Sequence, residues 1–297
     1  MKFFIPTVPR EFQPVSSKLR YPKYSADWGI EQDFERFIHS KPAFLAESPE
    51  EADFIFLPVY WTRYHINNDF GSKGLAPLAD YLSNFSVFGS RLLLICQYDD
   101  GPLVDVADST LYLASRKSDR GRDAPLLASS FPIPRVIGRR SRRATFAGNL
   151  KTHPIREQLQ DYALRVPDSK LYVESQNLNS QDYFRLLRSS ALAIAPRGYG
   201  GSSFRFFEAI SMGTVPWLIG ERDVRPFQTV LPPDTYSYYS PSVEAFQQAF
   251  EQIDWAGFAS KRRLVSRVAR KKFRFGAWPP LLIDDLKGIQ HSTATKN

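Results

Sequence analysis

The sequence of 297 residues predicts an α/β protein made of two doubly wound domains that face each other across a cleft. Short apolar runs alternate along the chain with segments of helical spacing. These runs are hydrophobic throughout, which is typical of parallel strands covered by helices on both faces. A segment rich in proline and arginine, residues 134–143, separates two such alternations and is interpreted as a linker. We therefore expect Rossmann-like domains at residues 1–135 and 136–297, with the last helix free to pack back on the first domain.

Each half contains the predicted elements in alternating order. In the first half we expect strands at 2–9, 52–61 and 91–98, and helices at 27–41, with Asp27 as N-cap, and at 75–85. In the second half we expect strands at 143–150, 170–175, 191–196 and 214–220. The helices expected there are 153–166 with Pro154 in its first turn, 180–190 capped by Ser180, 202–213 closed by Gly213, 242–253, and 258–273.

Composition excludes some classes of protein. The apolar fraction of 43% indicates a globular chain, and the single cysteine, Cys96, excludes an internal disulfide and suits a reducing compartment. No apolar run approaches the roughly 18 residues of a membrane span, and no signal peptide is recognisable, so we expect a cytoplasmic location. The net charge of +8 favours anionic ligands without choosing among them. We expect no nucleic acid partner, because the arginine run at 139–143 is more typical of a solvated segment.

A glycine-rich turn between the strand at 191–196 and the helix at 202–213 predicts an anion site. The glycines there permit positive φ and close approach of a ligand, and the helix N-terminus favours negative charge. Serine hydroxyls can cap the helix or bind phosphate, arginines add charge, and Glu208 could accept two ribose hydroxyls. A turn without a ligand is the alternative. The candidate residues in this stretch are Arg197, Gly198, Tyr199, Gly200, Gly201, Ser202, Ser203, Arg205 and Glu208.

The same stretch resembles a known signature. Residues 196–200, "PRGYG", with Ser203, Arg205, Glu208, the "GTVP" of 213–216 and the "RPF" of 225–227, are similar to the motif of exostosin-type glycosyltransferases, family 47 of the carbohydrate-active classification. Weaker matches are "EADFIFLPVYW", "CQYDDGP" and "FAGNLKTHPIR", the last ending in Arg156. The resemblance implies a GT-B fold with the donor, a UDP-sugar, bound by the C-terminal domain through Arg156 and the residues of the turn.

The resemblance also implies an activity. Members transfer a hexosyl or pentosyl group, with inversion, to a hydroxyl of a glycan or polysaccharide acceptor, and we expect no metal cofactor. An acceptor bound to a lipid would suit contact of the basic helix "SKRRLVSRVARKKFRF", residues 260–275, with a membrane, although a plain surface helix is the alternative. A second possible function is an inactive module that binds a sugar nucleotide and scaffolds a partner transferase.

An inverting transfer needs a general base, which we expect in the N-terminal domain. The family has His-Asp-Trp-Gly-Pro where this sequence has Tyr98, Asp99, Asp100, Gly101 and Pro102. Asp99 matches the family aspartate, and its neighbour Asp100 is an equal candidate because the flanking residues differ. Asp69 and His65, in an expected loop after the strand at 52–61, are the rivals. The aspartate pair could instead cap a turn or, in a GT-A enzyme, hold a metal ion.

Overall fold

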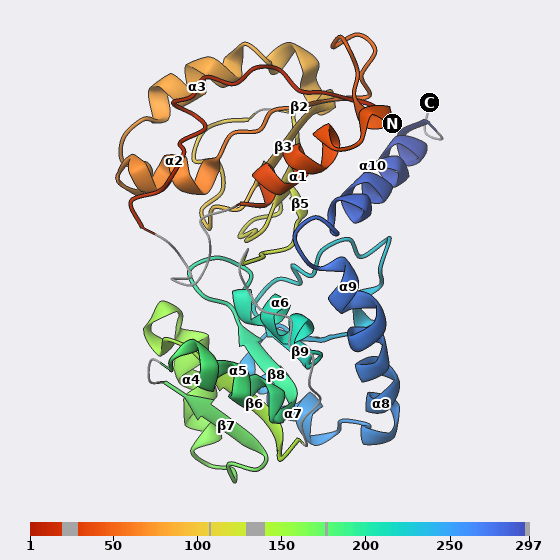
Figure 1. The fold of residues 1–297 in the computed structure, drawn as a ribbon. Helices are drawn as coiled ribbons and strands as arrows, with labels where there is room; N and C mark the ends of the chain where they lie inside the picture. The colour runs from red at the N-terminus through yellow and green to blue at the C-terminus, as the bar shows by residue number, and fades with distance from the viewer. Residues whose placement is uncertain (20–28, 107, 129–139, 176–177, 295–297) are drawn as a thin grey trace. The chain divides into compact units, whose positions relative to one another are not determined.

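The computed structural model describes residues 1–19, 29–106, 108–128, 140–175 and 178–294 (Figure 1). The chain divides into two compact units, of which unit 1 comprises residues 1–129 and 275–297 and unit 2 comprises residues 130–274. The expected domain boundary at residues 135 and 136, and the expected helix cap Asp27, lie outside the described residues. Each unit is a parallel sheet with helices on both faces, so the predicted α/β class with Rossmann-like architecture is confirmed.

Unit 1 contains five parallel strands in the order β1-β2-β3-β4-β5. On one face, Phe34 of α1 packs against Phe56, 4.9 Å between ring centroids, and near Trp278, which precedes α10. On the other face, α2 and α3 cover the sheet through an apolar cluster that includes Trp61 and Leu78 (Figure 1). The strands are β1 (Phe3–Phe4), β2 (Phe54–Phe56), β3 (Leu92–Cys96), β4 (Thr110–Leu113) and β5 (Arg122–Asp123), and the helices are α1 (Ile30–His39), α2 (Trp61–Asn67), α3 (Leu75–Ser83) and α10 (Pro279–Ala294).

The C-terminal helix α10 belongs to unit 1. Its Asp285 is buried and accepts hydrogen bonds from the Tyr112 hydroxyl at 2.6 Å and from Arg122 Nε at 3.0 Å. Because Tyr112 lies in β4 and Arg122 in β5, one carboxylate fastens the helix to two neighbouring strands.

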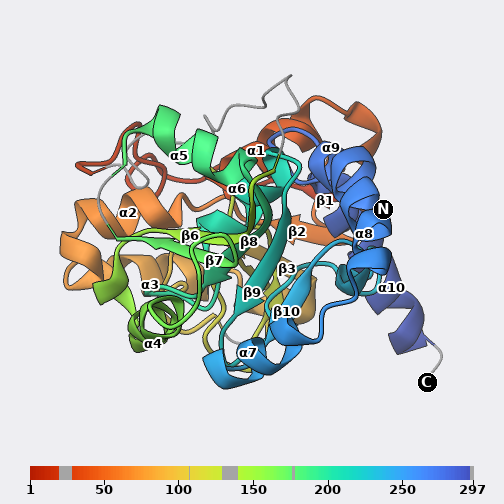
Figure 2. The same cartoon turned by 90° about the horizontal axis from the view of Figure 1, so that it is seen from below.

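Unit 2 contains five parallel strands in the order β10-β9-β8-β6-β7. Figure 2 shows α5 and α6 on one face of this sheet and α4 and α7 on the other. The strands are β6 (Arg142–Ala147), β7 (Leu171–Glu174), β8 (Ser190–Pro196), β9 (Val215–Ile219) and β10 (Tyr238–Ser240). The helices are α4 (Pro154–Ala163), α5 (Ser180–Arg188), α6 (Phe204–Ser211), α7 (Val243–Glu251), α8 (Trp255–Leu264) and α9 (Arg270–Lys272), with a π-helical segment, Val265–Ala269, between the last two.

The strand order of unit 2 reverses between β6 and β8. The chain leaves β6 in one direction to form β7, and then returns past β6 to form β8. At such a switch point the two connections diverge, and ligands bind beyond the carboxyl ends of the two strands. The glycine-rich turn follows β8 and therefore lies at this edge of the sheet.

Some local predictions are wrong. Only three residues of the expected strand at 52–61 form β2, because Pro58 cannot continue the hydrogen-bond ladder. Helix α2 then begins at Trp61, so His65 lies in a helix and Asp69 in a short 3₁₀ turn, not in a loop. Asn179 caps α5 in place of Ser180, because its side chain accepts from the Asp182 N–H at 2.9 Å.

Glu31 is a buried acid that the sequence did not reveal. It lies in the first turn of α1, is 1% exposed, and its Oε2 has no hydrogen-bond partner. A Cβ atom at residue 29 would lie 2.6 Å from this oxygen, so Gly29 leaves room for the carboxyl group. Burial raises the pKa of Glu31 to about 8, although N–H groups at the start of α2 oppose the shift.

This raised pKa predicts how stability depends on pH. A carboxyl whose folded pKa exceeds its unfolded pKa stabilises the fold below the unfolded value, and this contribution is lost as pH rises toward the folded value. Between about pH 4.5 and 8, the free energy of unfolding should fall with pH more steeply in the wild type than in Glu31→Gln, by up to about 1.4 kcal/mol per pH unit. Urea unfolding of both proteins measures the difference, and parallel pH profiles would contradict it.

Candidate functional site

Arg156 of α4 joins the carboxyl ends of β6 and β8. Its Nε donates to the Arg197 carbonyl at 2.8 Å, one terminal nitrogen to the Pro196 carbonyl at 3.1 Å, and the other to the Asn149 carbonyl at 2.9 Å. The guanidinium also lies over the ring of Phe146, 5.4 Å from its centroid, and the residue is 7% exposed. Arg156 therefore fixes the two strand ends to one another at the switch point.

The glycine-rich turn packs against this guanidinium. A Cβ atom at residue 198 would lie 2.9 Å from a terminal nitrogen of Arg156, so the absence of a side chain at Gly198 permits this close approach. Glycine permits positive φ, but Gly198, Gly200 and Gly201 are not among the positive-φ glycines of the described chain. The close approach is to a side chain of the protein itself.

Helix α6 begins as predicted. Ser203 is the N-cap, and its hydroxyl accepts from the Arg205 N–H at 3.3 Å, while Gly213 follows the helix with φ of 67°. Ser202 and Ser203 are each 5% exposed, whereas Tyr199 is 63% exposed. The turn therefore presents the Tyr199 side chain outward and buries its serines.

Glu208 lies inside unit 2, one turn into α6. It is 2% exposed, its Oε2 accepts a hydrogen bond from the Tyr183 hydroxyl, and a terminal nitrogen of Arg205 lies 3.6 Å from the same oxygen. Its Oε1 has no hydrogen-bond partner. Burial raises the pKa of Glu208 well above its usual range. A buried polar atom without a partner costs about 1–3 kcal/mol, so this oxygen is suited to a ligand hydroxyl.

Arg205 positions the helix that carries Glu208. Its Nε donates to the carbonyl of Ala147, the last residue of β6, at 3.0 Å, and its guanidinium lies over the Tyr183 ring, 5.1 Å from the centroid. Tyr183 comes from α5, and no sequence motif marked it. Two helices and the end of β6 thus hold the carboxyl group of Glu208.

Arg197 is paired with a carboxylate that the sequence analysis missed. One terminal nitrogen lies 2.6 Å from Glu221 Oε2, and Glu221 Oε1 lies 3.7 Å from His153 Nε2. His153 is the N-cap of α4, where its Nδ1 accepts from the Ile155 N–H at 3.4 Å. Burial, followed by the nearby Arg197, lowers the pKa of His153. In the sequence, His153 could have been found because it directly precedes Pro154, at the start of a helix. Glu221 could have been found because it is a carboxylate shortly after β9.

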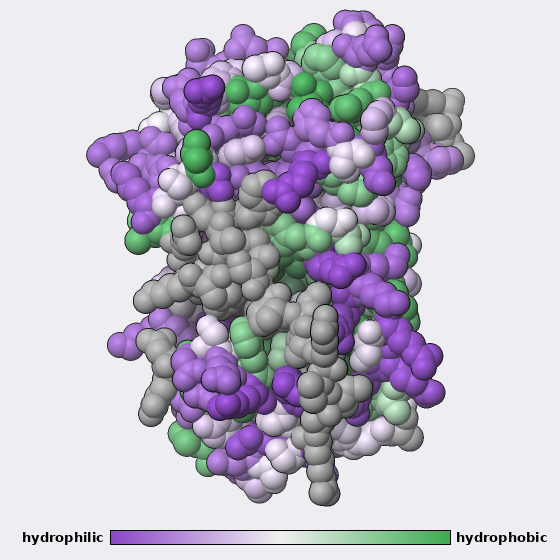
Figure 3. Space-filling model, in the orientation of Figure 1, coloured by the Kyte–Doolittle hydropathy of each residue, from purple (hydrophilic) through white to green (hydrophobic). Residues whose placement is uncertain are grey.

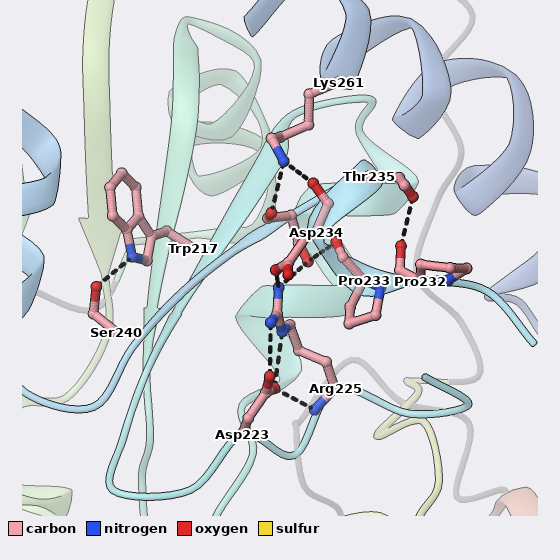
Figure 4. A network of polar contacts seen from close by, with 10 residues as sticks. Trp217, Asp223, Arg225, Pro232, Pro233, Asp234, Thr235, Ser240 and Lys261 are labelled. Carbon is pink, nitrogen blue, oxygen red and sulfur yellow. Dashed lines mark hydrogen bonds and ion pairs between the residues drawn. The ribbon is translucent and has the colours of Figure 1, made fainter. Parts of the chain in front are cut away.

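The loop after β9 is held by Arg225, the first residue of the "RPF" motif. Two of its nitrogens bind the two carboxylate oxygens of Asp223 at 2.8 and 2.6 Å, and a third lies 2.8 Å from Asp234 (Figure 4). Lys261 of α8 donates to the Ser237 carbonyl at 3.1 Å. Arg225 is 4% exposed, so its charge interacts with the carboxylates of the loop. The contacts of Arg225 therefore fix the loop that follows β9 and Glu221.

The candidate bases lie in unit 1. The turn after β3 is closed by a hydrogen bond from the Gly101 N–H to the Tyr98 carbonyl at 3.0 Å, and Asp100 forms an ion pair with Lys117. Asp99 and Asp100 line one pocket of about 200 Å³. The structure thus brings both aspartates to the same cavity, at the carboxyl end of β3.

The two rival bases have other environments. His65 is 0% exposed, and its ring lies 4.8 Å from the Tyr98 ring, behind the turn. Its pKa falls to about 4, chiefly because burial disfavours the cation. Asp69 is exposed and lies 2.6 Å from Lys73 Nζ, which lowers its pKa. His65 is therefore enclosed, and Asp69 is occupied by a surface ion pair.

No group of three or more His, Cys, Asp or Glu side chains in the described part of the chain could hold a metal ion. No described helix is long and apolar enough to cross a membrane.

Residues 129–249 match the family model of the exostosin GT47 domain. A solved structure entitled "Crystal structure of GtfA/B complex" is similar at 10% sequence identity and a TM-score of 0.34. The similarity covers 73% of this chain and 61% of that chain, so this chain spans about three fifths of that relative's length. The family match contains Arg156, the glycine-rich turn and Glu208. Residues 129–249 of this chain are therefore similar to the exostosin GT47 domain, a glycosyltransferase domain.

Proposed function

We propose that the chain is a cytoplasmic, inverting glycosyltransferase that moves a hexosyl or pentosyl group from a nucleoside diphosphate sugar, a UDP-sugar, to a hydroxyl of a glycan or polysaccharide acceptor. The observation that carries the proposal is the carboxyl group of Glu208, with one oxygen bound by Tyr183 and the other without a partner. A ribose has two neighbouring hydroxyls that can donate to such an oxygen. The site lies at the switch point, where nucleotides bind in doubly wound folds.

The diphosphate would lie against the N-termini of α4 and α6. Helix N-termini favour anions, and both helices start at the same edge of the sheet. Arg197 and His153 share Glu221, which is 55% exposed, so a diphosphate can replace this carboxylate as their partner. Arg156 and Arg205 hold the main chain around the proposed diphosphate site in place, because they donate to main-chain carbonyls. With protein groups to stabilise the leaving diphosphate, the proposed reaction uses no metal cofactor.

The role of Glu208 predicts a loss of nucleotide affinity. Glu208→Ala removes the acceptor of the ribose hydroxyls, so UDP binding should weaken by roughly 1–3 kcal/mol in titration calorimetry. Glu251→Ala is the matched control, because Glu251 ends α7 and pairs with Lys170 on the surface. Unchanged UDP affinity in a folded Glu208→Ala protein would remove Glu208 from the site.

Asp99 or Asp100 is proposed to be the general base that takes the proton of the acceptor hydroxyl. Both aspartates line the pocket in unit 1, and Asp100 is also paired with Lys117. General-base catalysis is typically worth about 10²–10⁴-fold, so Asp99→Asn should reduce kcat by such a factor. Donor affinity should remain near normal, because the donor site is in unit 2. The reaction should also proceed in EDTA.

Two results would contradict this assignment of the base. Full activity in both Asp99→Asn and Asp100→Asn would move the role to Asp69 or His65. Loss of activity in EDTA that Mn²⁺ restores would make the two aspartates metal ligands.

A catalytically inactive module that scaffolds a partner transferase is the second candidate. The observation that favours it is the state of the candidate bases, since Asp100 and Asp69 form ion pairs and His65 is enclosed. Assays of transfer and of hydrolysis with a panel of UDP-sugars separate the two functions. UDP binding without turnover of any sugar nucleotide supports the scaffold.

A lipid-linked acceptor would suit the basic surface of α8 and α9. The exposed cations Arg263, Arg267, Lys271 and Arg274 are spaced by four, four and three residues, while Val265, Ala269 and Phe273 on the opposite side are buried. Residues 255–278 contain no Asp or Glu. Figure 3 shows hydrophilic residues gathered over α8 and α9. Each such cation contributes about 1 kcal/mol near an anionic membrane.

This basic surface predicts membrane binding. The protein should co-sediment with vesicles containing phosphatidylserine at low salt, and a triple change of Arg263, Arg267 and Lys271 to Gln should abolish the effect. The same changes at the exposed residues Lys41, Arg165 and Arg185 form the control. If both triple variants co-sediment equally with the vesicles, these cations are solvated side chains that do not bind the membrane.

A further inference from the structure

Unit 1 contains a pocket whose size suits a single sugar ring. It lies at the carboxyl ends of β3 and β4, between residues 98–104 and residues 115–120, and has a volume of about 200 Å³. Pockets for drug-sized ligands measure roughly 300–1,000 Å³, so this cavity is too small for a sugar nucleotide. The carboxyl edge of a parallel sheet is also where ligands bind in such folds.

The cations of this pocket are neutralised within unit 1. Arg116 binds both oxygens of Asp123 at 2.8 and 2.9 Å, Lys117 pairs with Asp100, and Arg120 lies 3.2 Å from Asp105. A phosphate or carboxylate ligand would have to compete with these carboxylates. The pocket therefore disfavours an anion.

The hydroxyl and carboxylate groups of the lining suit sugar hydroxyls. Ser115, Ser118 and the carboxylates of Asp99 and Asp100 line the cavity. Carboxylate oxygens accept hydrogen bonds from hydroxyls, and serine hydroxyls both donate and accept. A neutral polyol matches such a wall, because each of its hydroxyls is itself a donor and an acceptor.

Leu103 gives the pocket an apolar wall. It has a φ of 58°, a left-handed conformation that typically costs about 1–3 kcal/mol in a residue other than glycine and that clusters at ligand sites. The side chain is 38% exposed and lines the cavity. A Cβ in place of a hydrogen of Gly71 would lie 2.2 Å from a Leu103 methyl group, so Gly71 makes room for it. The apolar C–H face of a sugar ring can pack on such a side chain.

We propose that this pocket binds one neutral sugar residue, with its ring against Leu103 and its hydroxyls bonded to Ser118 and the aspartates. In the enzyme this residue would be the end of the acceptor, a role that rests on the proposed function. The binding itself does not depend on that function. The pocket would therefore favour an acceptor that ends in a neutral sugar over one that ends in an acidic or phosphorylated sugar.

The test is an NMR titration of the whole chain with four neutral probes and two anionic ones. The neutral probes are the methyl glycosides of glucose, galactose, mannose and xylose, and the anionic probes are glucuronate and glucose 6-phosphate. At least one neutral glycoside should give saturable shifts in the amides of residues 98–104 and 115–120. Ser118→Trp, which adds a large side chain at an exposed lining residue, should abolish these shifts. Val87→Trp, at a residue that is 81% exposed and outside the pocket, should respond like the wild type.

Three results would overturn the proposal. These are the absence of shifts with all four glycosides, larger shifts in these amides with an anionic probe, and unchanged shifts in a folded Ser118→Trp protein. A chain that binds a glycoside in this pocket but transfers sugar from no sugar nucleotide would refute the proposed function and retain the pocket.

Discussion

The geometry of unit 2 depends on one guanidinium, that of Arg156. Where the strand order reverses, the chain leaves the neighbouring strands β6 and β8 in different directions, and the carbonyls near their ends need donors. Arg156 supplies three, to Asn149, Pro196 and Arg197, from a planar fork that fixes their relative positions. Gly198 lies against this clamp, where the absence of a side chain leaves room for a terminal nitrogen of Arg156.

The other arginines of the site extend the same arrangement. Arg205 ties α6 to the end of β6, and this contact sets where Glu208 meets Tyr183. Arg197 is held by Glu221, and Arg225 holds the loop that follows. Positive charge at this edge is thus largely matched by carbonyls and carboxylates of the protein. Such a site favours a ligand that replaces a specific partner over any polyanion, which limits what the net charge of +8 implies.

The sequence predicted the features that depend on local chemistry. Pro154 at the start of α4, Ser203 as the cap of α6 and Gly213 after that helix all lie where their backbone preferences place them. The sequence does not reveal the features that depend on tertiary contacts. The resemblance implies that Arg156 contacts the donor, and only the fold shows which carbonyls Arg156 meets. Tyr183 and Glu31 belong to no recognisable sequence motif. Their importance comes from the buried environment in which the fold places them. His153 and Glu221 lie far apart in the sequence and meet because α4 begins and β9 ends at the same edge of the sheet.

Hydrogen–deuterium exchange with and without UDP tests the central claim, that the edge held by Arg156 is the nucleotide site. The account predicts added protection in residues 148–156 and 197–208, which contain the clamp, the turn and Glu208, while residues 69–74 of unit 1 remain unchanged. Protection confined to unit 1, or no change at saturating UDP, would contradict it.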